Sequence, residues 1–379
     1  MHHRLNSTSG LLLIAVAGVS LTCSGEAPAP TRPGAAAPAL HSARSPTTTP
    51  QVSGTINRLQ AVSPVDENVV WASGKGGTYA LTTDGGQTWT SHVVPGAETL
   101  QFRDVQGVSA KVAYLLSAGS GSDSRIYQTE DGGKTWELRF QAPNNPDDFY
   151  DCFAFWTPTR GLAMGDGVNG RFPVLRTRSG ETWTDIGNNL PAAQAGEGAF
   201  AASGTCVATQ GERRAWIVTT SSRVFATRDG GDNWAAYGTP IAGGTGTAGV
   251  FTVAFRDRSH GIIGGGDFAA AGIIDNVARS SDGGKTWLLT KQAPLPGAVF
   301  GLSYANGSGE DGEDENEADG DRFKKTVVVT GPGGSAWTAD EGDTWNSLPG
   351  AAGYWAVAFA SPRAGWLVGT NGRILKISF

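Results

Sequence analysis

The chain has 379 residues, of which 55 are glycine, about twice the usual share of ~7%. It carries 12 Trp and 3 Cys, with 17% charged residues and a net charge of −6. These values exclude a collagen, a coiled coil, a disordered chain and a disulfide-stapled scaffold, and the acidic balance gives no electrostatic footprint for nucleic acid. Such a glycine-punctuated, aromatic-rich chain is typical of an all-β protein with many tight turns.

The first 23 residues have the pattern of a signal peptide, possessing a basic start and an apolar run over residues 11–21 that is too short to span a bilayer. Cys23 follows this run and is a candidate for lipidation, as in bacterial lipoproteins; ordinary cleavage nearby is the alternative. Residues 24–50, rich in Pro, Ala and Thr, predict a flexible tether. We therefore expect an exported protein that is periplasmic, extracellular or an outer-membrane lipoprotein, and that meets a membrane only through an N-terminal lipid.

An eight-residue motif, TTDGGQTW at residues 82–89, recurs about every 50 residues along the rest of the chain. Its Asp-Gly pair predicts a hairpin turn in which the Asp carboxylate and the first Ser or Thr form hydrogen bonds within the loop, while the Trp packs between neighbouring sheets. Six occurrences favour a structural role over a catalytic one. A worn copy at residues 177–183 is one residue short and has lost its Asp. The motif residues are Asp84, Asp131, Asp229, Asp282 and Asp340, with Trp89, Trp136, Trp183, Trp234, Trp287 and Trp345.

Short apolar runs such as residues 69–74 and 250–255 precede the motifs, so that each repeat predicts four strands. Repeated four-stranded units predict a seven-bladed β-propeller of antiparallel blades, in one domain over residues 51–379. Six regular blades plus an irregular one is the alternative. The seventh unit ends without a motif and lacks an outer strand, which we expect residues 51–56 to supply.

The motif resembles the Asp-box, or BNR repeat, of sialidases and related propellers. Together with the strand at residues 365–369 and the following Gly372-Arg373-Ile374, it is similar to the photosystem II stability/assembly factor-like family. This resemblance implies protein binding as the function. We therefore expect an exported, non-catalytic and monomeric scaffold, without a cofactor, for an envelope protein or a glycan. The alternative is a glycoside hydrolase, although the sialidase Arg-Ile-Pro signature is met only by Arg171-Phe172-Pro173, in the third unit rather than the first.

In Asp-box blades, the loops that follow the second and fourth strands lie on one face, here expected to bind the ligand. The candidate residues on that face are Asp151, Asp166, Arg171, Glu197 and Asp267. Carboxylates grouped with an arginine can bind a sugar, a cation or a peptide amine, or act as an acid/base pair. The alternative is that they cap strand ends and form local turns.

Two further expectations concern cysteines and acidic residues. Cys152 and Cys206 are expected at opposite ends of neighbouring inner strands, ~20 Å apart, and therefore too far for a disulfide. The acidic insertion at residues 306–322 does not follow the EF-hand pattern, which favours a solvated loop over a calcium site. No His/Cys spacing predicts a metal site.

Overall fold

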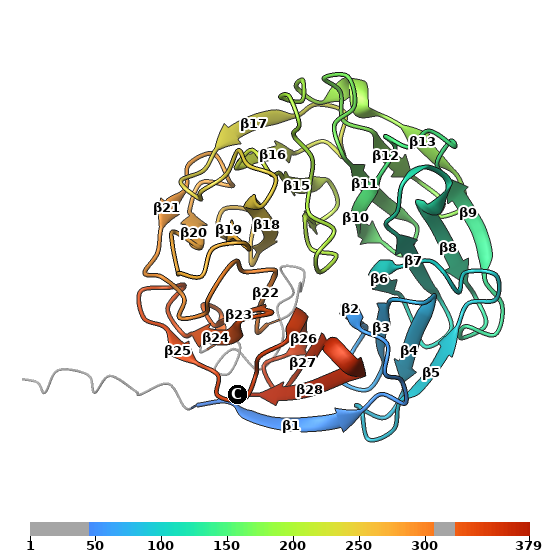
Figure 1. Cartoon of the computed structure of the whole chain (residues 1–379), viewed down its shortest axis with the longest axis horizontal. Coiled ribbons are helices and arrows are strands. Elements are labelled where there is room, and N and C mark those ends of the chain that lie inside the picture. The colour runs from blue at the N-terminus through green and yellow to red at the C-terminus, as the bar shows by residue number, and fades with distance from the viewer. Residues whose placement is uncertain (1–44, 307–322) are drawn as a thin grey trace, which may run out of the picture. The chain divides into compact units, whose positions relative to one another are not determined.

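The computed structural model of the protein describes residues 45–306 and 323–379. In this part of the chain, 28 strands form seven antiparallel sheets of four strands each, arranged as the blades of a ring (Figure 1). The seven-bladed β-propeller expected from the sequence is therefore confirmed. In each blade the first strand is the inner one, beside the central channel, and the last is the outer one.

The first three blades follow one another along the chain. Blade 1 consists of β2 (Leu59–Pro64), β3 (Val70–Gly74), β4 (Thr78–Thr82) and β5 (Thr90–Val93). Blade 2 consists of β6 (Phe102–Gly107), β7 (Ala113–Ser117), β8 (Arg125–Thr129) and β9 (Glu137–Gln141). Blade 3 consists of β10 (Tyr150–Thr157), β11 (Arg160–Gly165), β12 (Val174–Thr177) and β13 (Trp183–Asp185).

The next three blades repeat this order. Blade 4 consists of β14 (Val207–Gln210), β15 (Arg214–Val218), β16 (Arg223–Thr227) and β17 (Ala235–Gly238). Blade 5 consists of β18 (Ala248–Phe255), β19 (Gly261–Asp267), β20 (Val277–Ser280) and β21 (Leu288–Leu289). Blade 6 consists of β22 (Gly301–Tyr304), β23 (Val327–Gly331), β24 (Gly334–Thr338) and β25 (Asn346–Ser347). Within the described residues, three short 3₁₀ helices lie in the loops: η1 (Gly121–Asp123), η2 (Gly187–Asn189) and η3 (Thr370–Gly372).

Blade 7 closes the ring with both ends of the chain. It contains β26 (Tyr354–Ser361), β27 (Ala364–Gly369) and β28 (Arg373–Ser378), and its outer strand is β1 (Thr47–Val52), which pairs with β28. The N-terminal segment therefore closes the ring, as expected, but its strand begins at Thr47, inside the segment expected as a tether. Gln51 of β1 accepts hydrogen bonds from the indoles of Trp89 in blade 1 and Trp366 in blade 7, at 3.0 and 3.2 Å.

The repeated motif forms the turn between the third and fourth strands of a blade. In blade 1, the Asp84 carboxylate accepts hydrogen bonds from the Thr88 N–H at 2.9 Å and the Thr88 hydroxyl at 2.6 Å. Thr82 donates to the same carboxylate and accepts the Gly86 N–H, both within 2.9 Å. Gly85 and Gly86 have φ values of 70° and 84°, a region that glycine reaches without strain. Eight residues thus satisfy most of their own polar groups, which fits a structural role.

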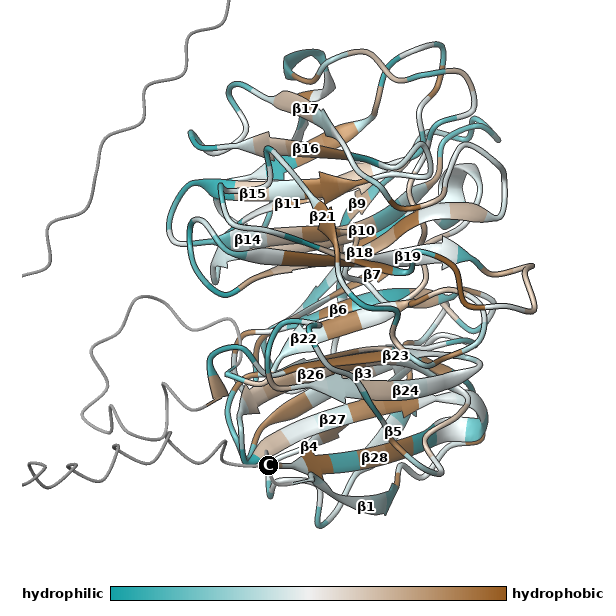
Figure 2. Ribbon diagram, turned by 90° about the vertical axis from the view of Figure 1, so that its left-hand side faces the viewer, coloured by the Kyte–Doolittle hydropathy of each residue, from teal (hydrophilic) through white to brown (hydrophobic). Residues whose placement is uncertain are grey.

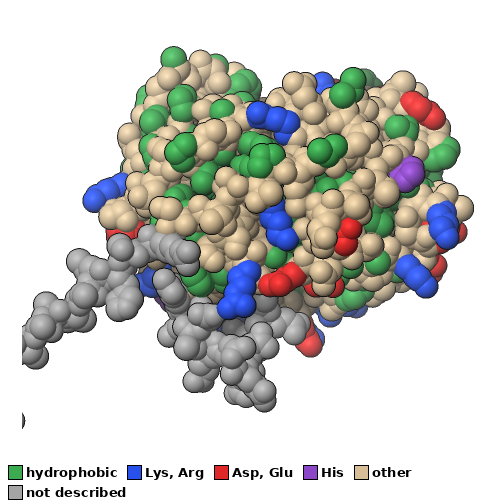
Figure 3. Space-filling model, turned by 90° about the horizontal axis from the view of Figure 1, so that it is seen from below, with side chains coloured by type: hydrophobic (Ala, Val, Ile, Leu, Met, Phe, Trp, Pro, Cys, Tyr) green, Lys and Arg blue, Asp and Glu red, His purple; other side chains and the backbone are tan. Residues whose placement is uncertain are grey.

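Apolar contacts between adjacent blades hold the ring together. Hydrophobic residues are concentrated in the strands (Figure 2), and the buried ones form clusters that mostly join two neighbouring sheets. The motif tryptophans take part in these contacts: the Trp136 ring of blade 2 packs edge-on against Trp71 of blade 1, with centroids 6.2 Å apart. On the edge of the ring below β1 and β28, the visible hydrophobic side chains are scattered (Figure 3).

Candidate functional site

The two faces of the propeller carry different loops. The motif turns and the hairpins between first and second strands lie on one face, here called the motif face; the remaining loops lie on the opposite face. The acidic insertion belongs to the hairpin between β22 and β23, but its residues 307–322 lie outside the described part of the chain.

On the opposite face, residues 198–206 form a channel loop that runs into the middle of the ring ahead of β14 (Figure 1). It contacts several blades. The Ala201 carbonyl accepts a hydrogen bond from Arg103 of blade 2 at 3.0 Å. Ser203 donates to the Phe300 carbonyl ahead of blade 6 at 2.6 Å. The loop thus bridges the channel, which explains why the sequence between Glu197 and Cys206 does not form a strand.

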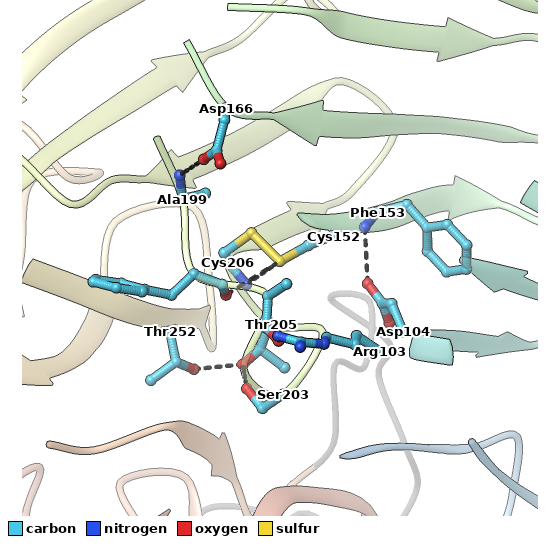
Figure 4. Close-up of a disulfide and its surroundings, with 12 residues drawn as sticks. Arg103, Asp104, Cys152, Phe153, Asp166, Ala199, Ser203, Thr205, Cys206 and Thr252 are labelled. Carbon is cyan, nitrogen blue, oxygen red and sulfur yellow. Dashed lines mark hydrogen bonds between the residues drawn. A yellow bond between two sulfur atoms is a disulfide. The ribbon is translucent and has the colours of Figure 1, made fainter. Parts of the chain in front are cut away.

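A disulfide anchors this loop, contrary to the expectation from the sequence. Cys152 and Cys206 are bonded, with Cα atoms 5.9 Å apart (Figure 4). The expectation placed Cys206 after the inner strand of blade 4, whereas β14 begins only at Val207. Both cysteines therefore lie at the same end of adjacent inner strands. The error arose because the channel loop was taken for the strand.

Of the five candidate residues, two lie side by side. Asp151 is the second residue of β10, and Asp166 follows β11 of the same blade. Burial raises the pKa of Asp151 well above its ordinary range, the nearby Asp166 carboxylate raises it further, and Arg103 opposes both. Burial also raises the pKa of Asp166, against a 2.9 Å hydrogen bond from the Ala199 N–H (Figure 4). Asp151 is buried and Asp166 half-buried, and Asp166 contacts the channel loop through Ala199.

The other three candidates have separate partners. Glu197 is buried and forms an ion pair with Arg223 of blade 4. Arg171 forms an ion pair with Asp185 of its own blade at 2.6 Å. Asp267 accepts a hydrogen bond from the Ala269 N–H at 2.9 Å, within its own loop. The structure therefore does not gather the five side chains around one centre.

The motif face carries a pocket of about 470 Å³ between blades 3 and 4. Its walls come from the hairpins and motif turns of the two blades. The lining residues are Trp156, Arg160, Arg176, Thr177, Arg178, Arg213, Asp229, Gly230 and Asp232. The pocket lies beside the worn motif copy, whose turn is one residue shorter than the others. We call it the arginine pocket.

Two of the four arginines in the arginine pocket are bound within the protein. Arg176 donates to Asp232 at 2.6 Å, and Arg160 donates to the Glu212 carbonyl at 3.2 Å. In the part of the chain that the structure describes, the exposed side chains of Arg178 and Arg213 form no hydrogen bond or ion pair. The pocket therefore presents two free guanidinium groups to solvent.

The charge of the arginine pocket is positive although the chain is acidic overall. Asp229 is held by its own motif turn, where it accepts hydrogen bonds from Asn233 at 2.8 and 2.9 Å. Asp232 is paired with Arg176. Next to the pocket, burial lowers the pKa of Arg214, and the charges of Arg228 and Arg258 lower it further. An anionic group would be attracted to this surface.

This pocket was not expected from the sequence, because the motif turns on this face were interpreted as structural. One signal was present: the worn copy lacks its Asp, and arginines stand on both sides of it at positions 176 and 178. The described residues contain no group of three or more potential metal ligands, and none of their helices has the length and apolarity to cross a membrane.

Residues 43–173, about a third of the chain, match the family described as photosynthesis system II assembly factor YCF48. No curated protein sequence matches the chain significantly. Among solved structures, YCF48 from Cyanidioschyzon merolae has a TM-score of 0.60 at 16% identity, covering 87% of this chain and 98% of that chain. The resemblance expected from the sequence, to Asp-box propellers of this family, is therefore confirmed.

Two other solved structures also match the chain. The GH74 xyloglucanase from Xanthomonas campestris has a TM-score of 0.59 at 14% identity, covering 87% of this chain and 53% of that chain. A structure described as YCF48 bound to D1 peptide has 16% identity and covers 88% of this chain and 97% of that chain. Its TM-score is only 0.41, so it carries no argument about a binding surface here. At these identities the structural matches show the fold alone.

Proposed function

We propose that this YCF48-like propeller is a non-catalytic binding scaffold for an acidic segment of a partner protein, which binds in the arginine pocket. The observation that carries the proposal is the pair of free guanidinium groups, Arg178 and Arg213, in a defined pocket beside Trp156. A guanidinium presents a fork of donors that matches a carboxylate, and arginine and tryptophan are enriched where proteins bind partners. The family match over residues 43–173 supports a protein as the partner.

The dimensions of the pocket favour a short segment. A volume of about 470 Å³ is in the range of pockets that hold a small ligand or a few side chains. The Trp156 indole donates to the Arg214 carbonyl at 2.6 Å, which fixes the ring at the wall of the pocket. Two neighbouring Glu or Asp side chains of a partner would meet the two free arginines while an apolar neighbour covers the tryptophan.

The direct test is a binding measurement with peptides that differ only in charge. A fluorescein-labelled ten-residue peptide of alternating Glu and Ala is titrated with the protein at low salt, and a Gln/Ala peptide serves as the neutral probe. We expect the acidic peptide to bind, and the double variant Arg178→Glu/Arg213→Glu to bind at least about ten-fold more weakly. The affinity should fall as salt is added.

The control has the same charge change on the same face. Lys134 and Lys285 are exposed residues of the motif turns of blades 2 and 5, away from the pocket. The variant Lys134→Glu/Lys285→Glu should retain the wild-type affinity within about two-fold. Equal losses in both variants would mean general charge attraction rather than a site, and would contradict the proposal.

The glycoside hydrolase alternative finds less support. Its carboxylate pair would be Asp151 and Asp166, but Asp151 is only 1% exposed and the pKa values of both are raised by burial. A glycosidase needs two carboxyl groups that flank a bound sugar, about 5–10 Å apart. Incubation with fluorogenic glycosides tests this directly: turnover that is lost in Asp166→Ala would contradict a non-catalytic scaffold.

We also propose that the protein is exported. The disulfide supports this, because such bonds persist in oxidising compartments and are rare in the cytosol. The signal-like residues 1–23, including Cys23, lie outside the described residues. Fractionation of cells that express the wild type and Cys23→Ser separates the outcomes: a lipoprotein leaves the membrane fraction in the variant, and a secreted protein is unchanged. Recovery of the uncleaved chain in the cytosol would reject export.

A further inference from the structure

A ring of bulged residues lines the channel, level with the disulfide. In five blades the register of the inner strand skips one residue, the second of the strand in four blades and the fourth in β18, so that this residue has no partner in the next strand. Bulges of this kind re-aim a side chain, and they are common beside functional sites. Phe300 takes the corresponding place in blade 6, where its N–H bonds the Thr330 carbonyl that lies opposite Gly301. This bulge ring consists of Gln60, Arg103, Asp151, Phe251, Phe300 and Trp355.

The bulge ring has an apolar sector, which the channel loop covers. Phe251 and Phe300 form a buried cluster with Ala202 of the loop, and the partly buried Phe200 and Trp355 pack against it, separate from the clusters between blades. Phe200 stacks on Phe251 with ring centroids 3.7 Å apart, and Phe300 meets Trp355 edge-on at 5.1 Å. These contacts place the bulged aromatic side chains inside the channel rather than between sheets.

The other sector, from blade 7 through blades 1 to 3, contains buried polar atoms that have no partner. Gln60 is fully buried and neither atom of its side-chain amide forms a hydrogen bond. Four further side-chain atoms are buried and form no hydrogen bond: Asp151 Oδ2, Arg103 Nε, Trp355 Nε1, and Nε of Arg58, which precedes β2. Buried polar groups are normally paired, and leaving them unpaired is unfavourable. Five residues of adjacent blades therefore have buried hydrogen-bonding atoms that are unsatisfied.

These groups are also uncompensated in charge. The Arg58 guanidinium lies over the Trp355 ring, 4.0 Å from its centroid, and within the described residues neither Arg58 nor Arg103 forms an ion pair. Burial lowers the pKa of Arg58, and the charge of Arg103 lowers it further. The charge of Asp151 acts on Arg103, and burial raises the pKa of this carboxyl. An anion placed here would offset the positive charges of two half-buried arginines.

We propose that the bulge ring binds a small organic carboxylate that carries a flat apolar group. Its carboxylate accepts hydrogen bonds from Arg58 Nε, Arg103 Nε and Trp355 Nε1. Its apolar group lies toward the aromatic sector, where Trp355 is only half-buried. The Gln60 amide and Asp151 remain for a further polar group of the ligand. This site does not depend on the proposed function, because it lies at the opposite ends of the inner strands from the arginine pocket: β10 begins with Tyr150 and Asp151 and ends beside Trp156.

The test uses matched pairs of acids and amides with the full-length protein. Phenylacetate and indole-3-acetate are titrated by isothermal calorimetry beside phenylacetamide and indole-3-acetamide, which have the same shape without the charge. We expect the acids to bind with dissociation constants below about 1 mM, and the amides to bind at least about ten-fold more weakly. If no acid binds more tightly than its amide, the proposal is wrong.

Two variants assign the binding to the ring. Arg103→Met removes a charged donor and should weaken phenylacetate binding by at least about ten-fold, and Trp355→Phe, which keeps an aromatic ring but removes the Nε1 donor, by about five-fold. Circular dichroism and thermal melting verify that each variant is folded; if Arg103→Met is not, Trp355→Phe decides. Arg178→Glu/Arg213→Glu is the control and should leave acid binding unchanged. Unaltered affinity in Trp355→Phe, or a high-resolution crystal structure grown with phenylacetate in which only ordered waters satisfy the ring, would overturn the proposal.

Discussion

Blade 5 and blade 3 are equivalent units of the ring, but the hydrogen bonds within their motif turns differ. In blade 5 the motif is complete, and Asp282 accepts hydrogen bonds from the Thr286 N–H at 3.0 Å and its hydroxyl at 2.7 Å. In blade 3 the Asp is gone, and Ser179 accepts only long hydrogen bonds of 3.3 and 3.4 Å from Glu181 and Thr182. Beside that weakened turn lies the arginine pocket, and the disulfide and channel loop connect the same blade to blade 4.

The difference indicates which repeats of such a protein have polar groups available for binding a ligand. A complete motif turn uses its polar groups within eight residues and leaves little for a ligand. The worn turn of blade 3 lacks the motif carboxylate, and arginines beside it remain available to a ligand. The disulfide between blades 3 and 4 stabilises this part of the ring instead.

Removing the disulfide should cost the most. Cys152→Ala/Cys206→Ala opens a loop with a sequence separation of 54, for which the chain-entropy estimate is about 4 kcal/mol in the free energy of unfolding. Denaturant unfolding of the oxidised wild type and the double variant measures this. A loss below about 1 kcal/mol would mean that blades 3 and 4 do not rely on the bond.

Truncating the side chain at the Asp position of the motif should destabilise blade 5 more than blade 3, where this residue is Ser179. Asp282→Ala loses hydrogen bonds at a partly solvated turn, so we expect a loss of about 1 kcal/mol. Ser179→Ala removes only the two long hydrogen bonds, and we expect a change within about 0.5 kcal/mol. Equal effects of the two substitutions in thermal unfolding would remove the contrast between the blades.

The complete motif turns should also give the protein an acid-sensitive stability. Hydrogen bonds from Thr88 lower the pKa of Asp84 to about 2, and those from Thr135 do the same for Asp131. Because these pKa values lie below the ~4 of an unfolded Asp, the turns stabilise the fold fully above pH ~4 and lose this contribution as the pH falls toward 2. Asp84→Asn should flatten this part of the stability profile. A profile identical to that of the wild type would contradict the role assigned to the carboxylate.

The smallest effect on stability is expected in the arginine pocket. Arg178 and Arg213 are exposed and without partners among the described residues, so Arg178→Glu/Arg213→Glu should change the free energy of unfolding by no more than about 0.5 kcal/mol. The same variant should lose affinity for the acidic peptide. A large destabilisation in urea unfolding would show that the arginines serve the fold instead of a partner.

The sequence by itself determined the architecture, because the fold repeats a local solution. The spacing of Asp, Gly and Trp marks six turns, and the apolar runs around them give the strands of seven blades. Ring closure could also be expected, since the last unit lacks an outer strand and an unpaired edge is unfavourable. Only the limit of that strand was displaced, to Thr47, because a polar outer strand has no apolar pattern to mark where it begins.

Only the tertiary structure decided what the irregular parts do. The path of residues 198–206 depends on partners in blades 2, 5 and 6, such as Arg103 for the Ala201 carbonyl, and no local pattern encodes contacts over about a hundred residues. For the same reason the disulfide was not expected. Of the five candidate residues, Asp151 and Asp166 lie side by side, whereas the other three have separate partners. The pocket and the bulge ring arise from side chains of adjacent blades, so their chemistry exists only once the ring has closed.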